Sequence, residues 1–238
     1  MRRLGYISMS LMLAAMAIYV CSCSTGGTSI EIKNDPIKPL PELKEGTVDP
    51  VNNAITISKD GITVIAEHWS RARLDRKYTT ADMRSPFFYL ETWDPSKQSE
   101  VFHVTIKNET PKWVVLDEDN TKLYDDRKYQ YNITPLETLR YKFVAKQYMD
   151  LKTKNGLEIA PQILLLEKLG PKKLISANTT VDGFLPYYTP STIAEKVWLI
   201  VTLEKEPVSQ TAVAEKVNFR FDYSQDLTLR KTQPPTKR

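Results

Sequence analysis

Hydrophobic and polar residues alternate along several short segments of the chain. Between positions 101 and 107, Phe102, Val104 and Ile106 are separated by the polar residues His103 and Thr105. A period of two places each set on its own face of a strand, so this pattern predicts a half-buried β-strand. Alternation or a β-rich composition predicts further strands at 54–57, 61–69, 87–93, 113–116, 121–124, 179–185, 196–203 and 216–223.

The connections between these segments refine the picture. The segment 196–203 is apolar on both faces, which is typical of a central strand covered on both sides. Lys59-Asp60-Gly61 predicts a tight turn, and Asp117-Glu118-Asp119-Asn120 predicts a hairpin turn between its neighbouring strands. Residues 71–86 are charged and irregular, so we expect a long loop there.

The period becomes helical after residue 134. Thr134-Pro135-Leu136-Glu137 supplies a capping residue, a proline suited to the first helical position and a glutamate at the third. Apolar residues then recur at helical spacing, which predicts a helix from 135 to about 152, ended by Asn155-Gly156. Residues 160–169 are a candidate second helix.

Together these elements predict one mainly β domain. Seven or eight short strands separated by turn signals favour an antiparallel β-sandwich, with a one- or two-helix insertion at about 135–170. We place this domain at residues 53–223. The basic, proline-containing segment 224–238 is expected to form a disordered tail.

The start of the chain has the pattern of a secretory signal. Two arginines next to the initiator methionine precede an apolar run from Tyr6 to Val20. This run is short for a membrane-spanning helix, which needs about 20 apolar residues. Val20-Cys21-Ser22-Cys23 then resembles the lipobox of bacterial lipoproteins. The resemblance implies that residues 1–22 are removed by signal peptidase II and that the Cys23 thiol carries a diacylglyceryl group.

Neighbouring residues refine this expectation. Cys21 is an alternative lipid site, but Tyr19-Val20 before it lacks the small residue that the peptidase prefers. By resemblance to proteobacterial sorting rules, Ser24 favours the outer membrane. An ordinary cleaved signal is the alternative interpretation, and the two arginines also allow the Tat route. Residues 23–52, which are polar and contain four prolines, predict a flexible tether.

The predicted sandwich resembles the immunoglobulin-like domains of bacterial lipoproteins. The resemblance covers about half of the chain and implies a binding or assembly role, but it transfers no site residue. It is carried by FHVTIKNE (102–109), LDEDNTKLYDD (116–126), TTVDGFLPYY (179–188) and KVWLIVTLE (196–204).

Charge and cysteine content narrow the possible functions. Without the two signal-peptide arginines, the formal net charge falls from +4 to +2, so the balance does not favour a nucleic-acid partner. Both cysteines lie at the N-terminus, at Cys21 and Cys23. A structural disulfide, a thiolate metal site and a cysteine nucleophile are therefore excluded from the body of the domain.

Few residues carry recognisable chemistry. His103 is expected to be solvated on the polar face of its strand, and His68 to be half-buried and hydrogen-bonded. The acids at 117–119 and 125–126 provide oxygen ligands of the kind that calcium prefers, but lysines occupy the EF-hand glycine and closing glutamate positions. We therefore expect no metal and no cofactor. Tyr187 and Tyr188, between two prolines, are the candidate interface residues.

These observations predict a lipid-anchored outer-membrane protein facing the periplasm. Its sandwich would act as a non-enzymatic binding or assembly subunit for an envelope protein partner, while its acyl chains contact the membrane. One alternative is a peptidoglycan- or carbohydrate-binding module, which needs exposed coplanar aromatic rings near a carboxylate. The other is an envelope hydrolase, which needs two carboxylates that converge in one cleft.

Overall fold

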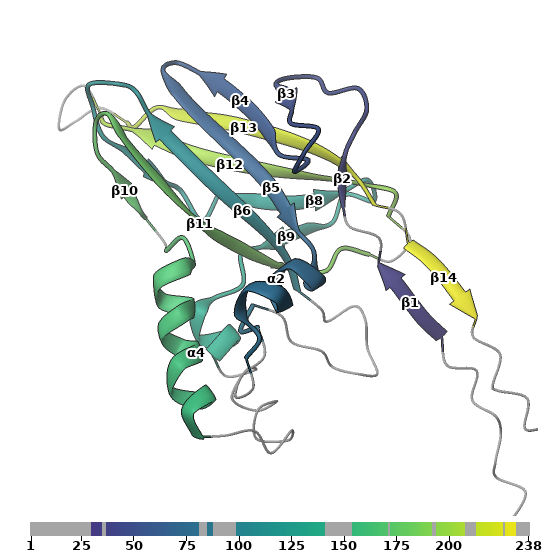
Figure 1. The fold of residues 1–238 in the computed structure, drawn as a ribbon. Helices are drawn as coiled ribbons and strands as arrows, with labels where there is room; N and C mark the ends of the chain where they lie inside the picture. The colour runs from purple at the N-terminus through teal and green to yellow at the C-terminus, as the bar shows by residue number, and fades with distance from the viewer. Residues whose placement is uncertain are drawn as a thin grey trace, which may run out of the picture. The chain divides into compact units, whose positions relative to one another are not determined.

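Two antiparallel sheets pack face to face in the computed structural model (Figure 1). The prediction of a mainly β, antiparallel sandwich is therefore confirmed. The structure describes residues 30–34, 37–80, 85–87, 99–140, 154–170, 172–191, 194–207, 213–225 and 227–231. The chain divides into two compact units, one formed by Asn34–Leu227 and one by its two ends.

The first sheet has the strand order β11-β6-β5-β4-β3. Asp60 and Gly61 join β4 to β5 with positive φ angles of 52° and 73°, the backbone that a tight type I′ hairpin requires. This confirms the predicted turn. The strands are β3 (Thr47–Val48), β4 (Ile55–Lys59), β5 (Ile62–Trp69), β6 (Ser99–Asn108) and β11 (Thr179–Tyr188).

The second sheet is built around β12, which pairs with β13 on one side and with β7 and β8 on the other. Its predicted central position is therefore confirmed. The sheet contains β2 (Lys38–Pro39), β7 (Val114–Leu116), β8 (Lys122–Asp125), β9 (Gln130–Asn132), β10 (Leu174–Ile175), β12 (Lys196–Lys205) and β13 (Lys216–Ser224).

The hairpin predicted at 117–120 is wrong. Leu116 pairs with Leu203 and Lys122 with Ile200, so β7 and β8 lie one after the other along β12. The loop between them lets both strands keep their apolar side chains in the core. The hairpin at this edge instead joins β8 to β9.

Alternating side chains of both sheets fill one core. In β13, Val217, Phe219, Phe221 and Tyr223 are buried, as their spacing predicted. The Tyr223 hydroxyl donates to the Ala66 carbonyl oxygen at 3.1 Å, a hydrogen bond that connects the two sheets. This bond satisfies a polar group that burial would otherwise destabilise.

The helices lie at one end of the sandwich (Figure 1), where they cover a second hydrophobic cluster. The loop expected at 71–86 is wrong in its first half, because Arg71–Tyr78 form helix α2. Ser70 caps this helix by accepting from the Arg73 backbone N–H. Leu74 and Tyr78, four residues apart, turn their side chains into the cluster.

The two helices expected within 135–170 have different outcomes. Residues 136–140 are helical, but 141–153 lie outside the described residues. The second helix, α4, spans Lys154–Glu167, so Asn155-Gly156 lie inside a helix instead of ending one. A Cβ at Gly183 of β11 would lie 2.8 Å from the Glu167 carbonyl oxygen, so glycine allows the end of α4 to approach the sheet. The strand predicted at 87–93 falls largely outside the described residues.

The predicted domain boundaries require correction at both ends. The tether was expected to reach residue 52, but Ile37 is buried, β2 pairs with β13 and β3 pairs with β4. Pro39 fits this position because an edge strand does not need every N–H for pairing. β1 (Ile30–Asn34) pairs with β14 (Leu227–Lys231), so the predicted disordered tail is also wrong at 227–231.

Candidate functional site

One row of side chains crosses the outer face of the second sheet. Leu174 pairs with Val115, Val115 with Glu204, and Glu204 with Lys216, which brings together four adjacent strands. Their neighbours along each strand point into the core, so these four side chains point away from it. Leu174 is 56% exposed, although it is a large apolar residue.

This row forms the floor of a groove of about 570 Å³. The 117–120 loop stands along one side, and the rest of the lining includes Trp113, Lys172 and Lys205. The volume falls within the range of about 300–1,000 Å³ that is usual for ligand pockets. The groove is amphipathic, because Leu174 and Val115 make one half of its floor apolar, whereas the Glu204–Lys216 ion pair makes the other half charged.

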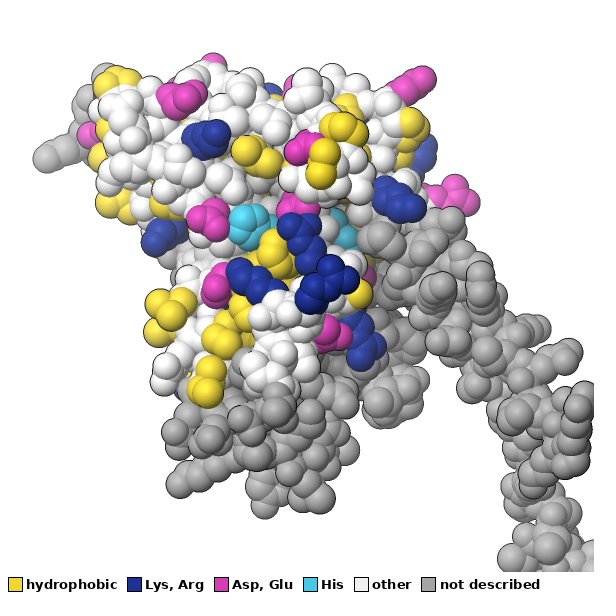
Figure 2. Space-filling model, viewed as in Figure 1, with side chains coloured by type: hydrophobic (Ala, Val, Ile, Leu, Met, Phe, Trp, Pro, Cys, Tyr) yellow, Lys and Arg dark blue, Asp and Glu magenta, His cyan; other side chains and the backbone are white. Residues whose placement is uncertain are grey.

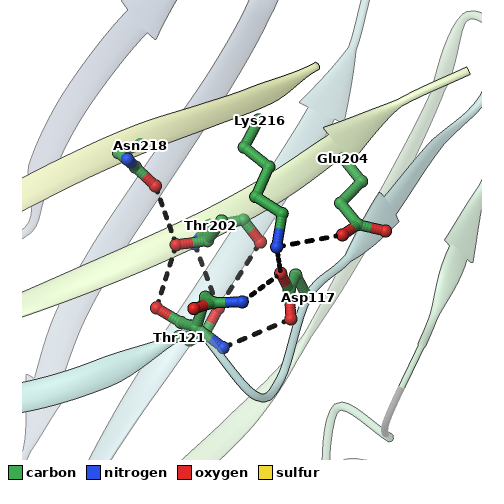
Figure 3. A network of polar contacts seen from close by, with 7 residues as sticks. Asp117, Thr121, Thr202, Glu204, Lys216 and Asn218 are labelled. Carbon is green, nitrogen blue, oxygen red and sulfur yellow. Dashed lines mark hydrogen bonds and ion pairs between the residues drawn. The ribbon is translucent and has the colours of Figure 1, made fainter. Parts of the chain in front are cut away.

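Asp117 fixes the loop that forms the wall of the groove (Figure 3). Its carboxylate accepts from the Asn120 backbone N–H at 3.2 Å and from the Asn120 side-chain amide at 2.7 Å. Lys216 Nζ donates to the same carboxylate at 2.7 Å and also pairs with Glu204 at 3.2 Å. These charge-assisted bonds connect the loop to β12 and β13.

Buried hydroxyl groups hold the same loop from behind (Figure 3). Thr121 Oγ1 accepts from the Thr202 backbone N–H at 3.0 Å, and Thr202 Oγ1 donates to the Asn120 carbonyl at 2.9 Å. The Asn218 side chain lies 2.8 Å from the Thr202 hydroxyl. Both threonines are almost fully buried, so the loop is held by satisfied polar groups and the groove is preorganised.

The charges of the groove are matched in pairs. Burial alone would raise the pKa of Asp117, but the Lys216 ammonium and the Asn120 donors outweigh it and hold that pKa below its usual value. Hydrogen bonds to Asp117 and Glu204 raise the pKa of Lys216. Two acids thus converge on one lysine, and Asp117 stays ionised near neutral pH. A general acid requires the opposite shift, which keeps its proton available.

Aromatic and basic side chains also meet where α2 joins the first sheet. The Arg73 guanidinium lies 3.9 Å from the centre of the Trp69 ring and pairs with Glu67. Lys77 lies over the rings of Trp69 and Phe184 at 5.4 Å. Such cation–π contacts hold α2 against the sheet and keep its cations near the surface.

The two histidines are held by carboxylates of the first sheet. His68 Nε2 lies 2.7 Å from Glu100 and its side chain is almost buried, which confirms the expected hydrogen-bonded environment. His103 Nε2 lies 3.0 Å from Asp182, and its ring packs against Trp69. His103 is thus less solvated than its place on the polar face suggested.

Tyr187 is not an interface residue, contrary to the prediction. It is fully buried in β11, where it pairs with Glu100 on one side and bridges to Ile133 on the other. The strand continues through Pro186, whose carbonyl accepts from the Thr134 N–H at 2.7 Å, so this proline does not mark a loop. Tyr188 is 37% exposed and stays at the surface.

Three findings concern the lipid site, metal binding and membrane-spanning helices. Cys23, the predicted lipid site, lies outside the described residues. Within the ranges that the structure covers, no three His, Cys, Asp or Glu side chains are grouped to hold a metal ion. Over the same residues, no helix has the length and apolar character needed to cross a membrane.

The sequence pattern drew attention to the acidic segment 117–120 but predicted a hairpin there, and it did not indicate the groove. The floor depends on the register of four strands, which no local pattern encodes. Searches against protein-family models, curated proteins and solved structures find no match to this chain.

Proposed function

We propose that this protein is a lipid-anchored component of the bacterial cell envelope that acts as a non-enzymatic binding or assembly subunit. The lipobox-like segment ending at Cys23 supports the anchor and the outer-membrane location. The groove on the second sheet supports the binding role and is the surface that receives the partner. An anchor raises the local concentration of the domain near a membrane partner, so a modest interface can suffice.

The preorganised wall of the groove is the observation that carries this proposal. The apolar half of the floor, formed by Leu174 and Val115 beside a rigid polar loop, is suited to receive an apolar side chain of a partner, with charged groups next to it. Leu174 and Trp113 provide apolar area, while Asp119 and Lys172 provide charges of both signs. The paired state of Asp117 and Glu204 favours binding over acid–base chemistry.

Replacement of Leu174 by aspartate is expected to weaken partner binding more than tenfold. The change puts a carboxylate in the apolar half of the floor, where the partner would have to desolvate it. A photo-cross-linking residue at position 174 of the otherwise native chain should form one dominant adduct in living cells. Affinity purification and mass spectrometry would identify that adduct.

Val51 is the matched control for this experiment. It is 90% exposed and does not line the groove, so Val51→Asp should leave the co-purified proteins unchanged. A cross-linker at position 51 should capture much less of the same partner. If position 174 captured nothing and Leu174→Asp left the co-purified proteins unchanged, the groove would not be the binding surface.

A second candidate function is carbohydrate or peptidoglycan binding, favoured by an aromatic pair on the same sheet face. Tyr124 and Trp198 are cross-strand neighbours whose rings are inclined by only 12°, with centres 6.0 Å apart. Both are half-buried. Arg220 lies 4.7 Å from the Trp198 ring and bonds to Asp222, so a carboxylate is close by.

If this pair binds glycans, Trp198→Ala should reduce co-sedimentation with purified peptidoglycan about tenfold, which corresponds to about 1.4 kcal/mol. Tyr129→Ala is the control. Tyr129 is 58% exposed on the β8–β9 turn, and its replacement removes an aromatic ring that is not part of the pair. Equal binding by the native chain and both variants would leave the groove as the better-supported site.

A further inference from the structure

Helix α4 carries an exposed apolar side. Ile159, Leu165 and Leu166 are 46%, 69% and 82% exposed, whereas Ala160 and Leu164 are fully buried. Ile159 and Leu166 are seven residues apart, so they lie on the same side of the helix, and Leu165 extends the apolar area around it. The helix thus presents one apolar side to the cluster beneath it and another to solvent.

The basic helix α2 borders this apolar surface. Lys77 Nζ lies 3.2 Å from Glu167 Oε2, which joins the last turn of α2 to the end of α4. The basic residues of α2 are Arg71, Arg73, Arg76 and Lys77. Among the described residues, the carboxylates of Asp75, Glu67 and Glu167 pair with Arg71, Arg73 and Lys77. The helix itself carries four basic residues and one acidic residue, so its exposed side is basic, and ion pairs at an exposed surface are weak.

The space-filling view shows both kinds of side chain on one face of the molecule. Figure 2 shows lysine and arginine side chains grouped where the helices meet the sandwich, with hydrophobic side chains exposed beside them. Leu74 and Tyr78 of α2 share a buried cluster with Leu164 of α4. The two helices therefore form one surface with a fixed shape.

From this arrangement we infer that the α2–α4 surface docks onto an anionic phospholipid bilayer. The α4 side chains enter the boundary between headgroups and acyl chains, and the α2 cations contact lipid phosphates. Apolar area next to arginine and lysine is the combination that interfacial helices use. This inference rests on the proposed anchor at Cys23. Cys23 lies only 14 residues before Ile37, so the chain between the lipid and the first buried residue spans at most about 50 Å and keeps the domain near the membrane.

The absence of cysteine after Cys23 allows a specific probe. In the lipidated chain, Gln162→Cys is labelled with an environment-sensitive fluorophore on the exposed side of α4. The protein is reconstituted in vesicles of phosphatidylglycerol and phosphatidylethanolamine, or of phosphatidylcholine alone. We expect a blue-shifted emission, quenched by spin-labelled lipid, in the anionic vesicles and a much smaller shift in the neutral ones.

Two variants connect this signal to the proposed contacts. Leu165→Gln/Leu166→Gln keeps residues that favour helices and should reduce the docked fraction more than tenfold. Arg71→Gln/Arg76→Gln should remove the preference for anionic lipid. The matched control is Val51→Gln/Val213→Gln, which replaces two residues that are 90% and 93% exposed and should change nothing.

The anchor and the docking contact can fail independently. The mass of the N-terminal residue reports the anchor alone. If Cys23 carries no lipid, the same probe is measured after adding Cys21→Ser/Cys23→Ser protein to the vesicles. A water-like emission at position 162 in both vesicle types would overturn the docking inference. Protection only in the presence of envelope proteins would also overturn it, and would identify the surface as a protein interface.

Discussion

Replacement of Cys23 by alanine is expected to abolish lipid attachment and to leave residues 1–22 on the chain. The lipobox resemblance implies that lipid transfer to the Cys23 thiol precedes cleavage, so loss of the thiol blocks both steps. One acyl chain binds a membrane only marginally, at about 0.8 kcal/mol per buried CH₂, whereas two or three make the attachment effectively permanent. Labelling with radioactive palmitate and the intact mass of the purified chain measure both effects.

Cys21→Ala provides the control for this experiment. Position 21 is a tolerated small residue in the lipobox pattern, so this variant should be labelled and cleaved like the native chain. Loss of label in Cys21→Ala, with retention in Cys23→Ala, would move the lipid site to Cys21. If the native chain itself took up no palmitate, the segment would be an ordinary secretion signal.

Local periodicity was sufficient to predict much of the sandwich. Side chains alternate between the two faces of a strand, whichever strand it pairs with. This alternation alone places four side chains of β13 in the core: Val217, Phe219, Phe221 and Tyr223. The Asp60-Gly61 turn was equally accessible, since both residues tolerate a positive φ. Such predictions succeed because the residues that form the feature are close together in the sequence.

Pairing between distant segments was not accessible in this way. The segments 113–116 and 121–124 look like the two arms of a hairpin, yet both pair with β12, about 80 residues later in the sequence. Tyr187 lies between two prolines, a pattern typical of a loop, yet its pairing with β6 and its bridge to Ile133 place it in a strand. In each case a contact distant in sequence determined the local structure.

Helix α2 illustrates a different reason for failure. The helix has four basic residues and one aspartate, and only two residues, Leu74 and Tyr78, show the apolar spacing of a helix. Ser70 is its N-cap. An eight-residue helix is too short to be stable by propensity alone, so it depends on the cluster against which it packs. The same dependence explains why its surface could not be predicted from its charge pattern.

Asp117 is expected to be the residue on which the groove most depends. Asp117→Ala should destabilise the protein by about 2–3 kcal/mol near neutral pH, because a buried acceptor disappears and the Asn120 donors lose their partner. Asp119 is exposed on the same loop, and Asp119→Ala should cost less than about 0.5 kcal/mol. Urea unfolding measures both values, and equal effects would contradict the role given to Asp117.

The pH dependence of the stability of Asp117→Asn distinguishes the contribution of the Asp117 charge from that of its hydrogen-bond geometry. Because the folded pKa of Asp117 is lowered, its contribution to stability is fully present above its unfolded pKa of about 3.9 and is lost as the pH falls through the folded value. The native chain should therefore be more stable than Asp117→Asn at pH 7, and the difference should shrink as the pH falls below about 4. A difference that stayed constant to pH 2 would mean that hydrogen-bond geometry, and not the Lys216 pair, holds the loop. In that event a partner could bind the groove without competing for Lys216, and salt would have little effect on its affinity.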